Sequence, residues 1–160
     1  EDRKRLGIFA NLNVTENISI CSLFHAMRNG LLSKQIEEDI VAEPIHQVGI
    51  KAPSLTANIS ELSGGNQQKC IISRWLLTKP RVLLLDDPTR GIDVGAKAEL
   101  YELIETLCQN GLAVILTSSE LPELLTLADR IIVMAEGRVT AEFPRDEADE
   151  KKIMAAATLA

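Results

Sequence analysis

Two neighbouring stretches decide the fold of this chain: LSGGNQQK at residues 62–69 and RVLLLDDPTRGIDVGAK at residues 81–97. Ser63 is a favourable N-cap, and apolar residues then recur at helical spacing as far as Leu77. The apolar run Val82–Leu85 has the composition of a strand buried on both faces of a parallel sheet. The two stretches therefore predict a helix over 64–77 and a strand over 82–85 within an α/β domain.

The start of the predicted helix and the end of the predicted strand carry residues suited to a phosphate and its metal. The first turn of a helix leaves unpaired N–H groups and a partial positive charge, and Gly64 and Gly65 let an anion approach the backbone. Asp86 and Asp87 follow the strand, at the end where ligands bind in open α/β sheets, and adjacent strand residues point to opposite sides. On the residues alone, a Ser-capped helix after a turn and a solvated strand end remain open as alternatives.

The motifs together resemble one family. LSGGNQQK, DPTRGIDVGAK, SSELPEL and DRIIVMAEG are similar to the second cassette of the tandem ATP-binding subunits in ATP-binding cassette (ABC) importers of ribose, galactose, xylose or arabinose. The resemblance runs from Glu1 to about Phe143 and implies the back portion of a P-loop ATPase cassette. No GxxxxGK[ST] loop occurs in the 160 residues, so the Walker A portion is absent from this chain. We expect a fragment, inactive alone, of a protein about three times longer.

The resemblance also implies roles for individual residues. In the ABC signature, Ser63, Gly64, Gly65 and Asn66 would close over ATP held by the first cassette, and Asp93 would be the D-loop aspartate. The family more often has Gln at the position of Asn66.

The remaining implied roles belong to the other nucleotide site. Glu1 stands at the lid (Q-loop) position, and Asp86 would hold Mg²⁺ through water. Asp87 replaces the usual catalytic Glu, and Ser119 replaces the usual His. These two departures predict a degenerate site that is slow or silent.

The resemblance implies an ATPase that drives monosaccharide import, with ATP and Mg²⁺ as cofactors. The implied partners are the first cassette of the same polypeptide, a membrane permease contacted through the helical subdomain, and indirectly a periplasmic sugar-binding protein. The implied location is the cytoplasmic face of the inner membrane, as a peripheral subunit. Alternatives are a nucleotide-responsive half that does not hydrolyse ATP, an importer ATPase for nucleosides or signalling sugars, and a non-transport ABC ATPase.

The amino-acid composition argues against some of these functional classes. The net charge of −6, a pI of about 5.0 and 3% aromatic residues argue against a nucleic-acid binder, and hence against ABC ATPases of DNA repair or translation. The three cysteines form no CxxC pair and fit a reducing compartment. No apolar run approaches the ~18–20 residues that span a bilayer.

The chain is expected to comprise an opening loop at the lid position (1–15), an α-helical subdomain (16–78) and an α/β portion (79–160). In the helical subdomain, Thr15 is a possible helix cap, breaks are expected at Asn29-Gly30, Pro44 and Pro53, and no strand pattern stands out. The α/β portion predicts β-α-β units, then a hairpin turning at Glu136-Gly137, then a terminal helix. Its later elements are expected at 95–109 (helix), 113–117 (strand), 121–127 (helix), 130–134 and 139–143 (strands) and 146–157 (helix).

Overall fold

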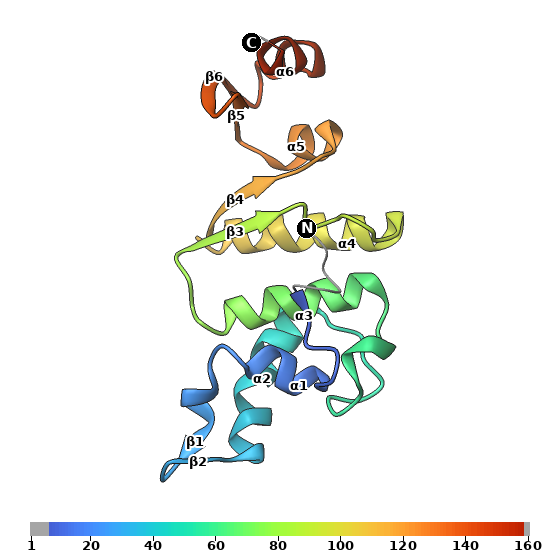
Figure 1. Ribbon diagram of the computed structural model, residues 1–160, viewed down its shortest axis with the longest axis vertical. Coiled ribbons are helices and arrows are strands. Elements are labelled where there is room, and N and C mark those ends of the chain that lie inside the picture. Colours follow the sequence, from blue (N-terminus) through green and yellow to red (C-terminus); the bar gives the residue numbers. More distant parts are fainter. Residues whose placement is uncertain (1–6, 159–160) are drawn as a thin grey trace. The chain divides into compact units, whose positions relative to one another are not determined.

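The structure is a computed structural model that describes residues 7–158 (Figure 1). These residues form two compact units. The first comprises residues 7–83 and Pro88–Val114, and the second comprises Leu84–Asp87 and residues 115–158. Glu1, expected at the lid position, lies outside the described residues, and the subdivision at 15/16 and 78/79 stays a prediction.

Three helices form the core of the first unit: α1 (Val14–Ser19), α2 (Lys34–Val48) and α3 (Gly64–Leu76). Each helix contacts the other two. The residues buried between them and the short helix η3 (Ile59–Glu61) are Val14, Ile18, Val41, Ile59, Leu62 and Cys70. Full burial of each aliphatic side chain contributes roughly 1.5–3 kcal/mol, so this cluster positions α3 and the signature at its start. Burial also raises the pKa of the Cys70 thiol to about 12, which makes it unreactive.

Two local expectations for the helical subdomain were wrong. Pro44 does not end a helix, because α2 continues through it to Val48 and buries Pro44. The packing of α2 against α1 and α3 outweighs the one backbone hydrogen bond that Pro44 removes from the helix. The cap of α1 is Asn13 rather than Thr15, since Asn13 and Glu16 form a capping box.

A small hairpin also lies where no strand was expected. After the short helix η2 (Leu23–Ala26), β1 (Met27–Arg28) pairs antiparallel with β2 (Leu31–Leu32). Asn29 and Gly30 turn the chain with φ values of 51° and 81°, which Asn and Gly tolerate best. The break expected at Asn29-Gly30 is therefore a two-residue hairpin turn, and such short strands leave no periodic signal.

The α/β elements follow the expected order. Strands β3 (Val82–Asp86) and β4 (Ala113–Thr117) are neighbours, with α4 (Val94–Gln109) between them in sequence. Ala113 N–H donates to the Arg81 carbonyl at 3.2 Å and Asp87 N–H to the Thr117 carbonyl at 3.0 Å, so the strands run parallel. Burial on both faces was not observed for β3, because Leu83 and Leu85 are buried whereas Val82 and Leu84 are exposed. A strand buried on both faces needs a layer on each side.

The second unit contains α5 (Leu121–Leu127), the hairpin β5 (Arg130–Ala135) and β6 (Arg138–Pro144), and α6 (Glu150–Ala157). The expected turn at Glu136-Gly137 is confirmed, with φ values of 48° and 76°. Helix α6 begins four residues later than expected, because Asp149 rather than an earlier residue caps it through the Lys152 N–H. The core of this unit is formed by Ile131, Val133, Ile153 and Ala156.

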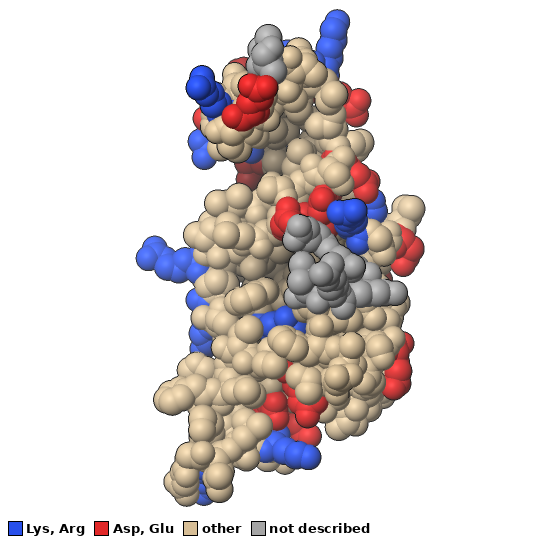
Figure 2. All heavy atoms as spheres, viewed as in Figure 1, with Lys and Arg blue, Asp and Glu red and all other residues tan. Residues whose placement is uncertain are grey.

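On the face drawn in Figure 2, acidic and basic side chains of the described residues are interspersed. Within residues 7–158, no helix has both the length and the apolar character needed to cross a bilayer. Exposed apolar side chains are prominent on η2 and the small hairpin, where Phe24 is 82% and Leu31 is 75% exposed.

Candidate functional site

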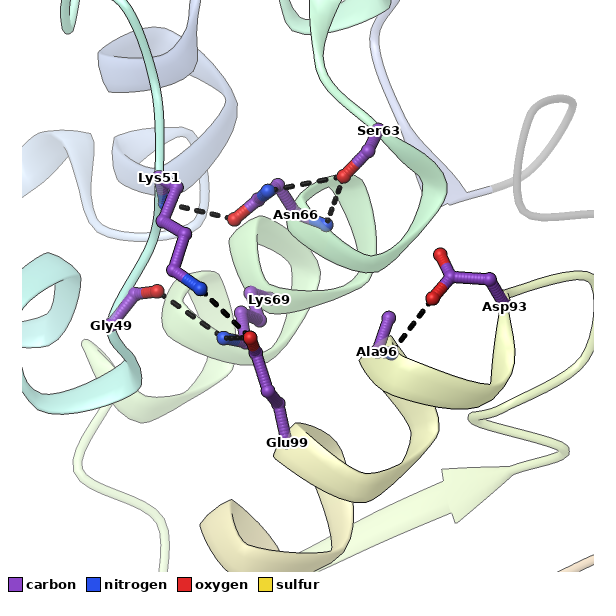
Figure 3. Close-up of polar contacts among 8 residues, drawn as sticks. All are labelled: Gly49, Lys51, Ser63, Asn66, Lys69, Asp93, Ala96 and Glu99. Carbon is purple, nitrogen blue, oxygen red and sulfur yellow. Dashed lines mark hydrogen bonds and ion pairs between the residues drawn. The ribbon is translucent and has the colours of Figure 1, made fainter.

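The start of α3 is organised by Ser63, which caps the helix as the sequence predicted (Figure 3). The Asn66 backbone N–H donates to Ser63 Oγ at 3.4 Å, and the Asn66 side-chain Nδ2 donates to the same oxygen at 3.1 Å. At its other end, Asn66 Oδ1 accepts from the Lys51 backbone N–H at 2.8 Å. The N-terminus of α3 carries the partial positive charge of a helix start, and the Ser63 side chain there is exposed to solvent.

The start of α4 lies against the start of α3. Asp93 caps α4 by accepting the Ala96 N–H at 2.9 Å. A Cβ placed on Gly65 would come within 2.6 Å of the Ala96 Cβ, so only glycine fits between the two helices without a shift. A hollow of about 280 Å³ opens here, lined by Lys51, Ser63, Gly65, Asn66, Lys69, Asp93, Gly95, Ala96 and Glu99.

A charged cluster stands at the wall of this hollow (Figure 3). Glu99 of α4 accepts from Lys51 Nζ at 2.8 Å and from Lys69 Nζ at 2.6 Å. Lys69 is almost fully buried and also donates to the Gly49 carbonyl at 3.2 Å. The hydrogen bonds from Lys51 and Lys69, with the charges behind them, lower the pKa of Glu99 to about 2. The cluster ties α4 to α3 and to the loop that follows α2.

Replacing Glu99 should change stability in a pH-dependent way. The pKa of Glu99 is about 2 in the folded protein against an ordinary 4.5, so its stabilisation is present above pH 4.5 and is lost as the pH falls toward 2. Because Glu99 is partly exposed, we expect Glu99→Gln in the full-length protein to cost only roughly 0.5–1 kcal/mol at pH 7. The difference between the urea midpoints of the variant and the wild type should therefore be smaller at pH 3 than at pH 7, and it should vanish only near pH 2.

The matched control for this titration is Glu102→Gln, an exposed position on the same helix. It should leave the midpoint unchanged at every pH. A Glu99→Gln deficit that stays constant down to pH 3 would show that the ion pairs do not cause it.

The ends of β3 and β4 bring the second group of predicted residues together. The Thr117 hydroxyl donates to Asp86 Oδ1, and the Ser119 backbone N–H donates to Asp87 Oδ1 at 2.6 Å. Asp87 has a φ of 43°, a left-handed conformation that Asp tolerates better than most residues. The two carboxylates thus have different neighbours, as adjacent strand-end residues should.

The donor set at this strand end fits Mg²⁺ held through water. Among residues 7–158, no group of three or more His, Cys, Asp or Glu side chains is placed to bind a metal ion directly. Mg²⁺ is commonly held by one or two carboxylates, water and the phosphates of a substrate. Asp86 could supply such a carboxylate, and its role toward Mg²⁺ stays a prediction.

Glu123 supports the segment that carries Ser118 and Ser119, and it was not singled out by the sequence. It is 1% exposed, accepts the Ser118 hydroxyl through Oε2, and its buried Oε1 has no hydrogen-bond partner among the described residues. Ser118 also accepts the Glu120 N–H at 3.0 Å. Through these bonds Glu123 fixes the segment that carries Ser119.

The structure thus separates the predicted residues into two groups. Ser63, Gly65, Asn66 and Asp93 gather in the first unit, whereas Asp86, Asp87 and Ser119 gather in the second. Sequence reasoning missed Lys51, Glu99 and Glu123. No local signal identifies Lys51 or Glu99, since 48 residues separate the ion pair. Glu123 could have been suspected because it is an acidic residue in the first turn of α5, directly after the polar residues 118–120.

Comparison with protein families gives one match that covers more than half of the chain. A family model described as "ABC transporter" matches residues 3–90. Among solved structures, the chain is similar to a dimeric bacterial ABC transporter cassette, with a TM-score of 0.72 and 23% identity over 89% of this chain and 60% of that one. A second ATP-binding cassette of an ABC transporter gives a TM-score of 0.75 and 19% identity over 97% and 70% of the two chains. These structures support the fold.

Curated relatives are more similar in sequence. A xylose import ATP-binding protein of Geobacillus kaustophilus is 46% identical over 99% of this chain and 31% of its own length. A ribose import ATP-binding protein of Rhodopirellula baltica is 50% identical over 98% of this chain and 31% of its own length. The chain therefore spans about a third of the length of these relatives.

Proposed function

The chain belongs to the ABC transporter family, and from this premise we propose that it is part of the ATP-binding and ATP-hydrolysing subunit of a bacterial monosaccharide importer. The observation that carries the proposal is the hollow where the N-terminus of α3 and the cap of α4 meet, with Ser63, Gly65 and Asp93 on one side. A capped helix start with an exposed hydroxyl suits a phosphate.

Monosaccharides are favoured as the cargo by the relatives. Those at 46% and 50% identity are named for import of xylose and of ribose, two pentoses. The same relatives are about three times as long as this chain, which leaves room for a first cassette on the same polypeptide. A nucleoside or signalling-sugar importer of the same architecture remains the alternative cargo class.

In the proposed arrangement the signature acts on a nucleotide held elsewhere. Ser63, Gly64 and Gly65 close over ATP and Mg²⁺ bound by the first cassette, and Asp93 lies beside them. Asp86, Asp87 and Ser119 belong to the other nucleotide site, which we infer to be slow or silent. This inference draws on the bond from the Ser119 N–H, which already occupies one carboxylate oxygen of Asp87.

The proposed partners are a membrane permease and, through it, a periplasmic sugar-binding protein. Exposed Phe24 and Leu31 on η2 and the small hairpin give the helical subdomain an apolar surface suited to a protein contact. The subunit would then be a peripheral protein on the cytoplasmic face of the inner membrane.

The test is reconstitution of the full-length protein with its proposed permease. ATP-driven uptake of labelled ribose, xylose or galactose into vesicles, in the presence of the cognate sugar-binding protein, would support the proposal. Nucleoside uptake without sugar uptake would select the alternative cargo. Failure of the full-length protein to copurify with the permease or to hydrolyse ATP would overturn the proposal.

One second function has a specific observation in its favour. The carboxylate of Asp87 is engaged by the Ser119 N–H, and this chain has no Glu at the catalytic position. These features also fit a half that responds to nucleotide without hydrolysing it. The substitution at Asp87 argued in the Discussion separates the two.

A further inference from the structure

The side-chain amide of Asn66 has a defined orientation, because one of its neighbours can only donate. The Lys51 backbone N–H lies 2.8 Å from one end of the amide, and a backbone N–H cannot accept, so that end is Oδ1. The other end is therefore the NH₂ group, and it lies 3.1 Å from Ser63 Oγ (Figure 3).

Ser63 Oγ consequently accepts two hydrogen bonds. One comes from Asn66 Nδ2 and one, at 3.4 Å, from the Asn66 backbone N–H. A hydroxyl has two acceptor lone pairs and one hydrogen. With donors facing both lone pairs, the remaining function of this exposed hydroxyl is to donate its hydrogen.

The backbone that orients Asn66 is itself held in place. Lys51 Nζ contacts Glu99, and Glu99 also contacts Lys69, which donates to the carbonyl of Gly49 two residues before Lys51. Gly49 is thus bonded to α3 and Lys51 to α4. Because these bonds hold the loop in place, the Lys51 N–H stays where it fixes the orientation of the Asn66 amide.

We propose that Asn66 is a positioning residue that commits the Ser63 hydroxyl to donate a hydrogen bond to a phosphate oxygen. The inference rests on the proposed function, in which Ser63 faces ATP. An amide at residue 66 gives a hydrogen bond to Ser63 and leaves the hydroxyl hydrogen for the phosphate. A carboxylate in the same place would take that hydrogen for itself and add a repelling charge.

The test is a double-mutant cycle on the ATPase activity of the full-length protein. Asn66→Ala should lower kcat/KM about 3- to 10-fold, and Asn66→Asp roughly 10- to 100-fold. In a Ser63→Ala background, which has no hydroxyl to direct, Asn66→Ala should change kcat/KM by less than about twofold. Alanine favours the helix but removes the bond to the Lys51 N–H, so the thermal midpoint of each variant is measured alongside its activity.

Gln68→Glu is the matched control for charge, because it adds the same charge two residues along α3. Asn66→Asp in the Ser63→Ala background should keep only the loss that Gln68→Glu causes. If the effects of Asn66→Ala and Ser63→Ala are simply additive, Asn66 does not act through Ser63 and this inference is overturned while the proposed function stands. If Ser63→Ala itself leaves turnover intact, Ser63 does not act on the nucleotide, and both this inference and the proposed role of the signature are overturned, whereas ATP hydrolysis by the subunit stands.

Discussion

Gly65→Asp is expected to lower the ATPase rate of the full-length protein by at least ~100-fold, the loss typical of removing one donor to a reacting anion. Two causes act together. The new carboxylate places a negative charge at the helix N-terminus where the proposed function puts a phosphate. Any Cβ at this position also meets the Ala96 Cβ at 2.6 Å, so α3 and α4 must separate.

A second substitution separates the two causes. Gly65→Ala brings the clash without the charge, and overpacking of this kind costs about 1–3 kcal/mol. Adding Ala96→Gly removes the Cβ of residue 96, and the atom then nearest to a Cβ on residue 65 is the Cα of residue 96, at 3.8 Å. The pair Gly65→Ala/Ala96→Gly should therefore recover most of the activity and thermal stability, whereas Gly65→Asp/Ala96→Gly should stay inactive. Full turnover by folded Gly65→Asp would show that this signature does not serve the active site.

Asp87→Asn is expected to change the ATPase activity of the intact transporter little, within about threefold. The matching acid-to-amide change in the proposed first cassette should remove nearly all activity. Asp is one methylene shorter than Glu, so its carboxylate sits roughly 1–1.5 Å farther from the water it would orient, and a misplacement of ~1 Å can cost about 100-fold.

The surroundings of Asp87 reinforce this asymmetry. Its Oδ1 accepts the Ser119 N–H at 2.6 Å, so one carboxylate oxygen is already engaged. The resemblance implies a histidine where this chain has Ser119, and losing one donor that stabilises charge on a transferring phosphoryl group costs ~100- to 1,000-fold. The two losses lie in one cluster and need not multiply.

The measurement compares steady-state ATPase rates of the two single variants and the wild type in the same vesicles. Ser119→His is a useful companion, since the imidazole alone should not restore catalysis while Asp87 remains short. If Asp87→Asn by itself eliminates turnover, the second site is catalytic and the asymmetric proposal is wrong. If both single variants leave turnover intact, neither acid limits hydrolysis and the proposed assignment of the active site fails.

Local chemistry explains where sequence reasoning succeeded. Helix α3 was predicted to within one residue at its end because Ser63 caps it and its apolar spacing is regular. The turn at Glu136-Gly137 followed from Gly137, a residue suited to positive φ, between two apolar runs, although Glu136 also adopts a positive φ of 48°. The helix-breaking effect of Pro44 was overestimated, because the packing of α2 against α1 and α3 cannot be read from the neighbouring residues in the sequence. The start of α6 was misplaced because several acidic residues precede it and only Asp149 caps it.

Local sequence was enough to predict the chemistry of the candidate site: a capped, glycine-rich helix start and two adjacent aspartates at a strand end, in an order typical of ABC cassettes. Tertiary structure alone decided how that chemistry is supported. The contact of Gly65 with Ala96, the link of Lys51 and Lys69 through Glu99, and the bond from Ser119 to Asp87 join residues between 30 and 48 positions apart, or fall between separate elements. Periodicity and capping act within one or two turns of chain, whereas these contacts depend on how folded elements pack, so no local pattern encodes them.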